Sequence, residues 1–336
     1  MPTYSGTTPR LFALSTASPN ASVHVVSINA PASSVDADLA LVPKGAGALS
    51  ADVADSGYGG NKRGAFATDW MHTGNGVRSS GSQVAAGGYA TLGGGGYNQA
   101  GTTAHTDVSI PGGFSHTVTA NTGTIGGGYY NTLTGAGATA RGGERHVISG
   151  QNATVMGGYQ NVASAKDATV PGGKYASASL IGKYAYTAGP IYFSNAGQFC
   201  LHILRGATTS ASPVTLTADA SPQSALNHTV LVNAQVFGFE LDVICNSAAI
   251  GTSATDYGLY GAQWTITGLV RRASGVGSTT IIGTPYVTAN ADASLAAVTV
   301  SVTAETATYG SLQVTVGGLA ATNMHWVATI QTTEVS

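Results

Sequence analysis

Apolar residues recur through the middle of the chain with a fixed period of fifteen residues. One column follows a Ser or Thr in every repeat and comprises Ile110, Ile125, Ala140, Val155 and Val170. A second column comprises Val118, Leu133, Ile148, Ala163 and Ala178. Apolar and β-branched residues bounded by turn residues favour short strands. Each repeat is therefore predicted to hold two short strands joined by turns.

Glycine pairs occupy the turn after the first column and keep the same period. The pairs are Gly112 and Gly113, Gly127 and Gly128, Gly142 and Gly143, Gly157 and Gly158, and Gly172 and Gly173. A repeat this strict is typical of one small unit stacked along an axis. A flexible glycine-rich linker would not retain ordered apolar positions. We predict a β-roll shaft over residues 79–189, capped by less regular turns.

The apolar columns are thin, which bears on the number of chains in the shaft. Each turn supplies about two medium apolar side chains, which is little against the entropy of ordering fifteen residues. We therefore expect several chains to bury these columns against one another, and we predict a homotrimer. The residues expected to pack the shaft and the trimer are Ile110, Ile125, Val155, Val170, Val118, Leu133 and Ile148.

A third column alternates between histidine and asparagine. It comprises His116, Asn131, His146 and Asn161, and ends at Ala176. Asparagine adopts left-handed turn conformations readily, so a turn position is predicted here. The alternative is a histidine column that binds an ion in a symmetric assembly.

Beyond about residue 190 the period stops and the predicted strands lengthen. Alternating apolar positions mark two strands, one with Val298, Val300 and Val302 and the other with Leu312, Val314 and Val316. Core residues are expected at Trp264, Ile266, Trp326, Ala328 and Ile330. The segment 190–336 is predicted to form an antiparallel, jelly-roll-like β-sandwich. With an extended arm at 1–35 and a small strand-and-turn unit at 36–78, the chain is expected to be all-β.

Composition and charge narrow the function classes. Charged residues make up 8% of the chain, against about 25% in an average globular protein. The net charge is −2, and no basic cluster extends beyond Arg271 and Arg272, so nucleic-acid binding is not expected. Neither a membrane span nor a signal peptide is recognisable, so we expect synthesis in the cytosol without ordinary export. Cys200 and Cys245 lie in apolar segments and are expected to be buried free thiols.

Catalytic motifs are not recognisable in the sequence. The fifteen carboxylates form no recognisable acid/base pair, the eight histidines show no metal-binding spacing, and no nucleophile elbow is present. We therefore expect no enzyme, no cofactor and no metal. A carboxylate pair assembled across subunits, for instance from Asp107, Glu144 or Asp167, stays open.

Several segments together resemble phage tail fibre proteins. The front segment "LALVPKGAGALSADVAD…GGNKRGAFATDW" is followed by turns such as "TIGGGYYNTLTG" and "TVMGGYQN". Near the end, "FSNAGQFCLHILRGATT", "AQWTITGLVRRA", "TTIIGTPYV", "GSLQVTVGGL" and "MHWVATIQTTEV" resemble the C-terminal domain of the same fibres. The resemblance covers about residues 36–336.

The resemblance implies a trimeric virion component that is assembled in the host cytoplasm. It implies a front end attached to phage tail or baseplate proteins and a terminal domain that meets a host surface receptor. Two alternatives stay open. One is a tailspike that degrades host polysaccharide, and the other is the head of a trimeric bacterial adhesin, which would need an export signal and an anchor.

Receptor binding is expected on loops of the C-terminal domain. The longest turn-rich stretch, 246–261, places Asp256, Tyr257 and Tyr260 close together in sequence. Tyrosine rings cover the apolar faces of sugars and carboxylates accept from their hydroxyls, so we predict glycan binding here. Further candidates are Tyr309, Arg271 and Arg272. The alternative is that these loops only pack or mediate contacts between subunits.

Overall fold

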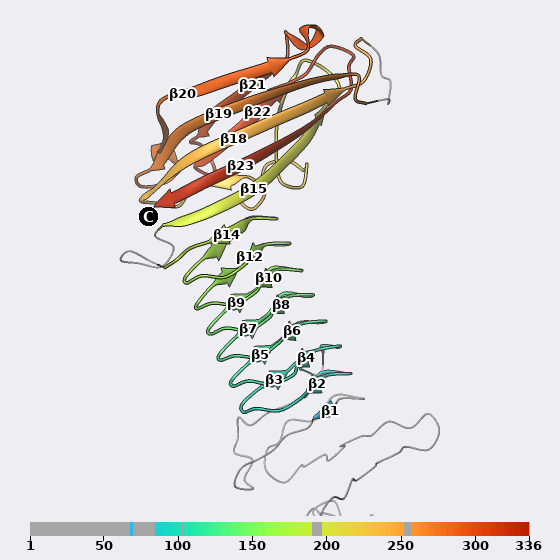
Figure 1. Ribbon diagram of the computed structural model, residues 1–336, viewed down its shortest axis with the longest axis vertical. Helices are drawn as coiled ribbons and strands as arrows, with labels where there is room; N and C mark the ends of the chain where they lie inside the picture. Colours follow the sequence, from blue (N-terminus) through green and yellow to red (C-terminus); the bar gives the residue numbers. More distant parts are fainter. Residues whose placement is uncertain (1–67, 70–84, 103, 190–196, 252–256, 336) are drawn as a thin grey trace, which may run out of the picture.

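The computed structural model describes residues 68–69, 85–102, 104–189, 197–251 and 257–335. This part of the chain is built from β-strands, with two 3-10 helices of three residues at Val276–Ser278 and Ala293–Leu295. A stack of very short strands leads into a sandwich of long ones (Figure 1). The all-β prediction is confirmed. The predicted arm at 1–35, and the unit at 36–78 except for 68–69, lie outside the described residues.

The shaft is a β-solenoid with two strands per turn. One side consists of β1 (Thr68–Asp69), β2 (Thr91–Leu92), β4 (Ser109–Ile110), β6 (Thr124–Ile125), β8 (Thr139–Ala140), β10 (Thr154–Val155), β12 (Thr169–Val170) and β14 (Tyr184–Tyr186). The other side is a parallel sheet of six strands, β3 (Gln99–Ala100), β5 (Thr117–Val118), β7 (Thr132–Leu133), β9 (Val147–Ile148), β11 (Val162–Ala163) and β13 (Ser177–Ala178). Each strand pairs in parallel with its counterpart one turn away, as Thr154 does with Thr169. The predicted short strands are confirmed.

Both apolar columns lie inside the coil of a single chain. Every member of the two columns is fully buried, and both columns belong to one core cluster. Small residues such as Ala138, Ala153 and Ala168 fill the rest of the interior, so the two sheets approach closely. The expectation that other chains are needed to bury these columns is therefore corrected. The strands face each other across the coil and cover the columns themselves.

The second glycine of each pair is required by the stacking of turns. Gly128 and Gly158 both have a φ of 95°, a conformation that strains other residues. A Cβ on Gly128 would also collide with the carbonyl oxygen of Gly143 in the next turn. These positions therefore admit glycine alone.

The histidine and asparagine column points into the coil and is fully buried. The amide nitrogen of Asn131 donates to the carbonyls of Gly127 at 3.2 Å and Gly143 at 3.1 Å. Its Oδ1 accepts from the backbone N–H of His146 at 2.9 Å. His146 Nδ1 in turn accepts from the N–H of Asn161 at 3.1 Å. The column therefore links successive turns through their backbone.

The predicted turn position was wrong by one residue. Left-handed φ values of 51–64° belong to the preceding positions, Ser115, Tyr130, Arg145, Gln160 and Tyr175. The physical reason is that the corner leaves backbone groups without ladder partners, and inward-pointing amides and imidazoles satisfy them.

Within the described part of the chain, no three His, Cys, Asp or Glu side chains are grouped to hold a metal ion.

The C-terminal part is an antiparallel β-sandwich, as predicted. Its larger sheet contains β15 (Gln198–Thr208), β23 (Met324–Val335), β18 (Gln235–Ser247), β19 (Tyr260–Arg272) and β20 (Thr279–Ala291), in that order. Its smaller sheet contains β16 (Pro213–Thr215), β22 (Ser311–Gly317), β17 (Thr229–Val230) and β21 (Thr299–Glu305). The predicted core residues Trp264, Ile266, Trp326, Ala328 and Ile330 are all buried between the sheets.

Shaft and sandwich share one continuous sheet. β14 pairs in parallel with β12 of the last complete turn and antiparallel with β15 of the sandwich. A buried ion pair joins the two parts, since Lys183 Nζ lies 2.9 Å from Glu334 Oε1. Gln198 donates to the other carboxylate oxygen of Glu334 at 2.7 Å. The junction is therefore held by buried polar contacts as well as by the sheet.

The two cysteines are buried free thiols, as expected. Burial is the main cause that raises the pKa of Cys200 to about 12 and that of Cys245 to about 11. Both thiols are therefore protonated and unreactive at neutral pH.

Candidate functional site

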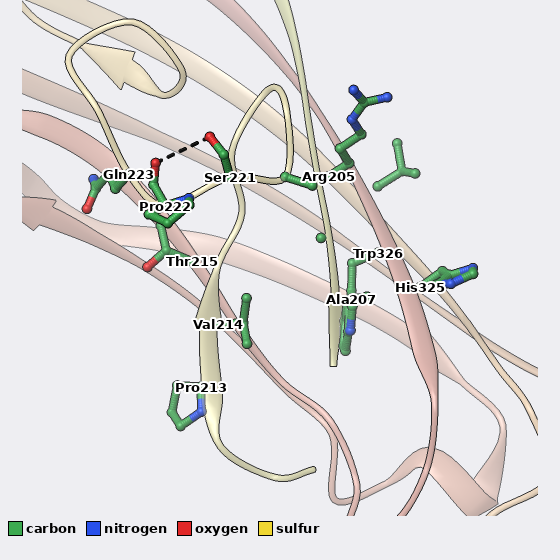
Figure 2. A pocket seen from close by; sticks show the side chains of 13 residues that line it. Arg205, Ala207, Pro213, Val214, Thr215, Ser221, Pro222, Gln223, His325 and Trp326 are labelled. Carbon is green, nitrogen blue, oxygen red and sulfur yellow. Dashed lines mark hydrogen bonds between the residues drawn. The ribbon is translucent and has the colours of Figure 1, made fainter. Parts of the chain in front are cut away.

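A groove of about 840 Å³ opens in the C-terminal sandwich, beside the strand that pairs with the shaft. β15 pairs with the shaft strand β14 through Leu201 and reaches the groove at Arg205, about 13 Å farther along the strand at roughly 3.3 Å per residue. Figure 2 shows its two walls, with Arg205, Ala207, His325 and Trp326 on one side and Pro213, Val214, Thr215, Ser221, Pro222 and Gln223 on the other. The groove thus lies between the edge of the larger sheet and a segment of the smaller one.

Strand register brings the polar residues of the first wall together. Arg205 lies opposite Val327, and Ala207 lies opposite His325, on the paired strands β15 and β23. Arg205 and His325 are both exposed on the outer face of the larger sheet, and their side chains point away from the opposite wall in Figure 2. Alternation along each strand places the neighbouring Trp326 on the core side, where its indole donates to Thr208 Oγ1 at 3.0 Å.

Hydrogen bonds fix the second wall. Asn227 is fully buried, and its amide nitrogen donates to Asp219 at 2.9 Å and to the Pro222 carbonyl at 3.0 Å. Ser221 Oγ donates to the same carboxylate at 2.7 Å. Desolvation opposes ionisation, but the hydrogen bonds from Ser221 and Asn227 outweigh it and lower the pKa of Asp219. The charged carboxylate therefore holds the wall in one shape.

Tyr257 connects the predicted binding loop to the groove. Its ring stacks on His325, with centroids 3.8 Å apart and planes 18° apart. The N–H groups of Gly258 and Leu259, the next two residues, both donate to the Ser247 carbonyl at 3.2 Å. The loop end that carries Tyr257 is therefore anchored beside the groove.

The structure disperses the other predicted binding residues. Tyr260 is half-buried and packs against the sandwich core, and Asp256 lies outside the described residues. The Tyr309 hydroxyl donates to the Gln223 carbonyl at 3.2 Å, which supports the groove wall from behind. Arg272 donates to the carbonyls of Leu231 at 2.6 Å and Tyr309 at 3.1 Å. Arg271 is exposed on β19 and does not line the groove.

Sequence reasoning missed Arg205 and His325, the two cationic or titratable side chains of the groove. A signal for Arg205 was present, because a charged residue interrupts the apolar segment "FCLHIL" just where the strand continues. His325 gave no such signal, since its neighbour Trp326 marks the strand only as core. The stacking of Tyr257 on His325 joins loop and strand through the fold, which no local pattern encodes.

The chemistry of the groove suits a polyhydroxylated ligand. At the rim, Arg205 offers several donors in a fixed plane and the stacked Tyr257 and His325 offer an aromatic surface, while Ser221 and Gln223 offer polar groups on the opposite wall. Pro213 and Pro222 add apolar surface. Few polar groups on a largely apolar wall are typical of small-molecule and sugar sites. Its lining residues include no carboxylate.

The carboxylates considered for catalysis lie elsewhere. Glu144 forms an ion pair with Arg145 at 3.1 Å on one corner of the solenoid. Asp107 and Asp167 lie at another corner, in separate turns, and Asp167 accepts from Asn152 at 3.2 Å.

A closer pair lies on the outer face of β18. Glu240 and Asp242 are two residues apart on this strand and so project on the same face, with Cα atoms about 7 Å apart. Glu240 borders a hollow of about 280 Å³. The sequence analysis did not single out this pair.

No family model and no curated protein matches the sequence. Among solved structures, the tailspike protein of Acinetobacter baumannii phage AM24 matches with 10% identity and a TM-score of 0.20, over 72% of this chain and 53% of its own. The tailspike protein gp49 of Acinetobacter baumannii bacteriophage Fri1 matches with 7% identity and a TM-score of 0.22, over 77% and 48%. The tailspike protein of Acinetobacter phage vB_ApiP_P1 matches with 11% identity and a TM-score of 0.21, over 72% and 50%.

These neighbours are all phage tailspike proteins, in agreement with the resemblance seen in the sequence. The chain spans about half the length of each of them. TM-scores near 0.2 assign neither a site nor a mechanism, so the groove is interpreted from its own geometry.

The comparisons correct one expectation. The Fri1 protein is described as a capsular polysaccharide depolymerase, which is an enzyme. This contradicts the expectation that the chain is not an enzyme, and cleavage of polysaccharide returns as an activity to test.

Among the residues that the structure describes, no helix is long and apolar enough to cross a membrane.

Proposed function

We propose that this chain is a receptor-binding protein of a phage tail, which adsorbs to a host surface glycan through the groove of its C-terminal sandwich. The observation that carries the proposal is the rim of the groove, where Arg205 and the Tyr257–His325 stack lie on the outer face of the larger sheet. A rigid shaft that carries a sandwich with a polar and aromatic surface is suited to adhesion.

The proposed assembly is a homotrimer in the virion, formed in the host cytoplasm and attached to tail or baseplate proteins through its N-terminal part. The predicted domains at 1–35 and 36–78 would serve that attachment. Exposed apolar side chains away from the groove, such as Leu269 on β19 and Ile282 on β20, give it surface for contacts between chains.

Binding of the full chain to host strains that lack defined surface glycans tests the proposal. Arg205→Ala and Tyr257→Ala are each expected to weaken adsorption at least tenfold, because they remove donors or ring surface from the groove. Tyr286→Ala is the matched control. This tyrosine is highly exposed on β20, which β18 and β19 separate from the groove strand β23 in the larger sheet. Equal adsorption by wild type and both groove variants would refute the assignment of the site.

Cleavage of the glycan is measured in the same system. Release of reducing ends from purified host polysaccharide distinguishes a depolymerase from a protein that only binds. If release occurs, Glu240→Gln and Asp242→Asn identify whether the carboxylates of β18 cause it, because a glycosidase needs two carboxyl groups about 5–10 Å apart. Loss of release with retained adsorption would separate a catalytic face from the binding groove.

A further inference from the structure

An exposed column of aromatic rings follows the glycine pairs along one corner of the solenoid. Its members are Tyr97, Phe114, Tyr129, Tyr130, Tyr159 and Tyr175, and we call this set the aromatic column. The side chains of Tyr97, Tyr129 and Tyr130 are 52%, 57% and 47% exposed. Rings of adjacent turns touch, with centroids 5.2 Å apart for Tyr97 and Phe114 and 5.7 Å apart for Tyr159 and Tyr175. The rings therefore form two clusters, Tyr97 to Tyr130 and Tyr159 to Tyr175, separated by the turn that carries Glu144 and Arg145.

Cations are interleaved with these rings. Arg145 lies 5.6 Å from the centre of the Tyr130 ring and 5.9 Å from that of Tyr159, and it donates to the Tyr159 hydroxyl at 2.8 Å. Lys174 lies 5.3 Å from the Tyr159 ring and 5.4 Å from the Tyr175 ring. These contacts hold the charges at the level of the rings.

The corner is locally positive in a chain of net negative charge. Within the five corner segments 111–115, 126–130, 141–145, 156–160 and 171–175, the charged residues are Arg141, Arg145, Lys174 and Glu144. Glu144 pairs with Arg145, which leaves Arg141 and Lys174 without a carboxylate in these segments. The whole chain carries a net charge of −2. An anionic ligand would therefore be attracted to this corner rather than to the surface at large.

The first glycines of the pairs keep the surface beside the rings open. A Cβ on Gly112 or Gly142 would meet no atom within 4 Å, and neither residue has a left-handed φ. The fold of one chain therefore does not require glycine at these two positions, unlike Gly113 and Gly143. A hollow of about 580 Å³, lined by glycines together with Phe114 and Tyr129, lies along this strip.

We propose that the aromatic column is a second ligand-binding surface, which takes an extended acidic polysaccharide lying along the shaft. Successive turns are about 4.8 Å apart, so a linear ligand meets an aromatic or cationic side chain at each turn. Tyrosine rings pack against the apolar faces of sugars, and Arg145, Arg141 and Lys174 pair with their carboxylates. The proposal goes beyond binding at the groove and does not depend on it.

Charge distinguishes this ligand from a second copy of the chain. If the column faced the axis of an in-register trimer, three copies of Lys174 would meet at one level, and the segment 171–175 supplies no carboxylate to neutralise them. Like charges brought together in this way are destabilising. The column is therefore assigned to the outer surface of the assembly.

Binding of the full chain to polygalacturonate, a linear acidic glycan, tests the proposal, with a neutral linear glucan of equal length as the comparison ligand. Tyr159→Ser and Lys174→Gln are each expected to weaken polygalacturonate binding at least fivefold, and added salt is expected to weaken wild-type binding. Lys166→Gln and Tyr286→Ala are the matched controls, because they remove an exposed cation and an exposed ring away from the column. Circular dichroism of each variant verifies that the fold is retained.

Separate outcomes decide this proposal and the groove. Retained binding by both column variants overturns the aromatic column, and so does equal affinity for the neutral glucan. A change in the sedimentation coefficient of the column variants also overturns it, since the column would then be a contact between copies. Lys166→Gln is expected to leave polygalacturonate binding unchanged, and host adsorption is measured separately with the groove variants, so failure of the groove there does not affect this result.

Discussion

His146 and Asn131 occupy equivalent positions in neighbouring turns, yet they satisfy the backbone differently. Both accept a backbone N–H from the next turn, but only the asparagine amide also donates to two glycine carbonyls. The Nε2 atoms of His116 and His146 are buried without a hydrogen bond of good geometry. At the residue scale, the asparagine is therefore the better fit to the coil, and histidine makes the shaft sensitive to acid.

The pKa of His146 predicts this sensitivity. Desolvation by burial lowers it from 6.5 to about 4, against an opposing hydrogen bond with Gly142. The unfolded chain therefore binds a proton at this histidine more tightly than the folded chain does. The contribution of neutral, buried His146 to the free energy of unfolding is fully present above about pH 6.5 and is lost as the pH falls from there towards 4. His146→Asn is expected to narrow the difference in melting temperature between pH 7.5 and pH 4.5. His325→Asn removes an exposed histidine. If it narrowed the difference in melting temperature as much as His146→Asn does, burial of His146 would not be the cause.

Asn131→Ala tests the asparagine directly. The substitution leaves the Gly127 carbonyl and the His146 N–H in the coil without a partner, while the Gly143 carbonyl still accepts from the Tyr129 N–H, at a cost of about 2–3 kcal/mol in the free energy of unfolding. Denaturant titration of the full chain measures the loss. Asn290→Ala, at an exposed position of β20, is expected to change stability by less than about 0.5 kcal/mol. Equal effects of the two substitutions would show that the internal hydrogen bonds contribute nothing.

The residue pattern predicted the apolar inner positions better than the polar ones. Ile125 and Leu133 could be placed inside because an apolar side chain at a fixed period has one favourable environment. His116 and Asn131 could not be placed inside from the sequence, because a polar residue is equally compatible with a solvent-facing turn and with an inward position. The inward position follows only from the unpaired backbone groups at the corner, which their side chains satisfy.

At the scale of elements, strands of two residues are stable here because each is one rung of a long ladder. β10 pairs with β8 on one side and β12 on the other, so its backbone groups are satisfied in both directions. The fifteen-residue period predicted these strands without knowledge of their partners. It did not predict the junction, because Lys183 and Glu334 are separated by 151 residues and no local pattern connects them.

The buried ion pair at the junction yields a prediction for its elements. Glu334→Gln leaves the Lys183 ammonium without its carboxylate, which is expected to cost about 3–5 kcal/mol. The double substitution Lys183→Met and Glu334→Leu removes both charges and is expected to cost less than Glu334→Gln alone. Thermal unfolding of the full chain compares them. A double variant less stable than the single one would show that the pair itself, rather than the avoidance of an unpaired charge, stabilises the junction.

At the scale of the whole molecule, the fold of the shaft does not by itself require more than one chain. The columns that predicted a trimer are buried within one chain, so a single chain can complete its own shaft core. The sequence could not reveal this, because a periodic apolar column is identical whether a second sheet or a second chain covers it. The groove could not be predicted from the sequence either, because its walls come from β15, β16, β23 and the segment 220–223, which are far apart along the chain.

The trimer stays a prediction with a direct test. Sedimentation equilibrium of the full chain is expected to give about 100 kDa, three times the mass of 33.4 kDa. A folded species of single-chain mass at micromolar concentration would refute it. The binding variants of the groove and the column should be measured on the same preparation, so that changes in avidity are not mistaken for changes in affinity.

The continuous sheet through β12, β14 and β15 has a mechanical consequence. Because the hydrogen-bonded ladder passes from shaft to sandwich, and Lys183 and Glu334 are bonded across the same boundary, the sandwich cannot swivel on the shaft. A sideways pull on a ligand held in the groove is therefore delivered as torque along the whole rod. The described part of the molecule acts as a stiff lever, in which shaft and sandwich turn together.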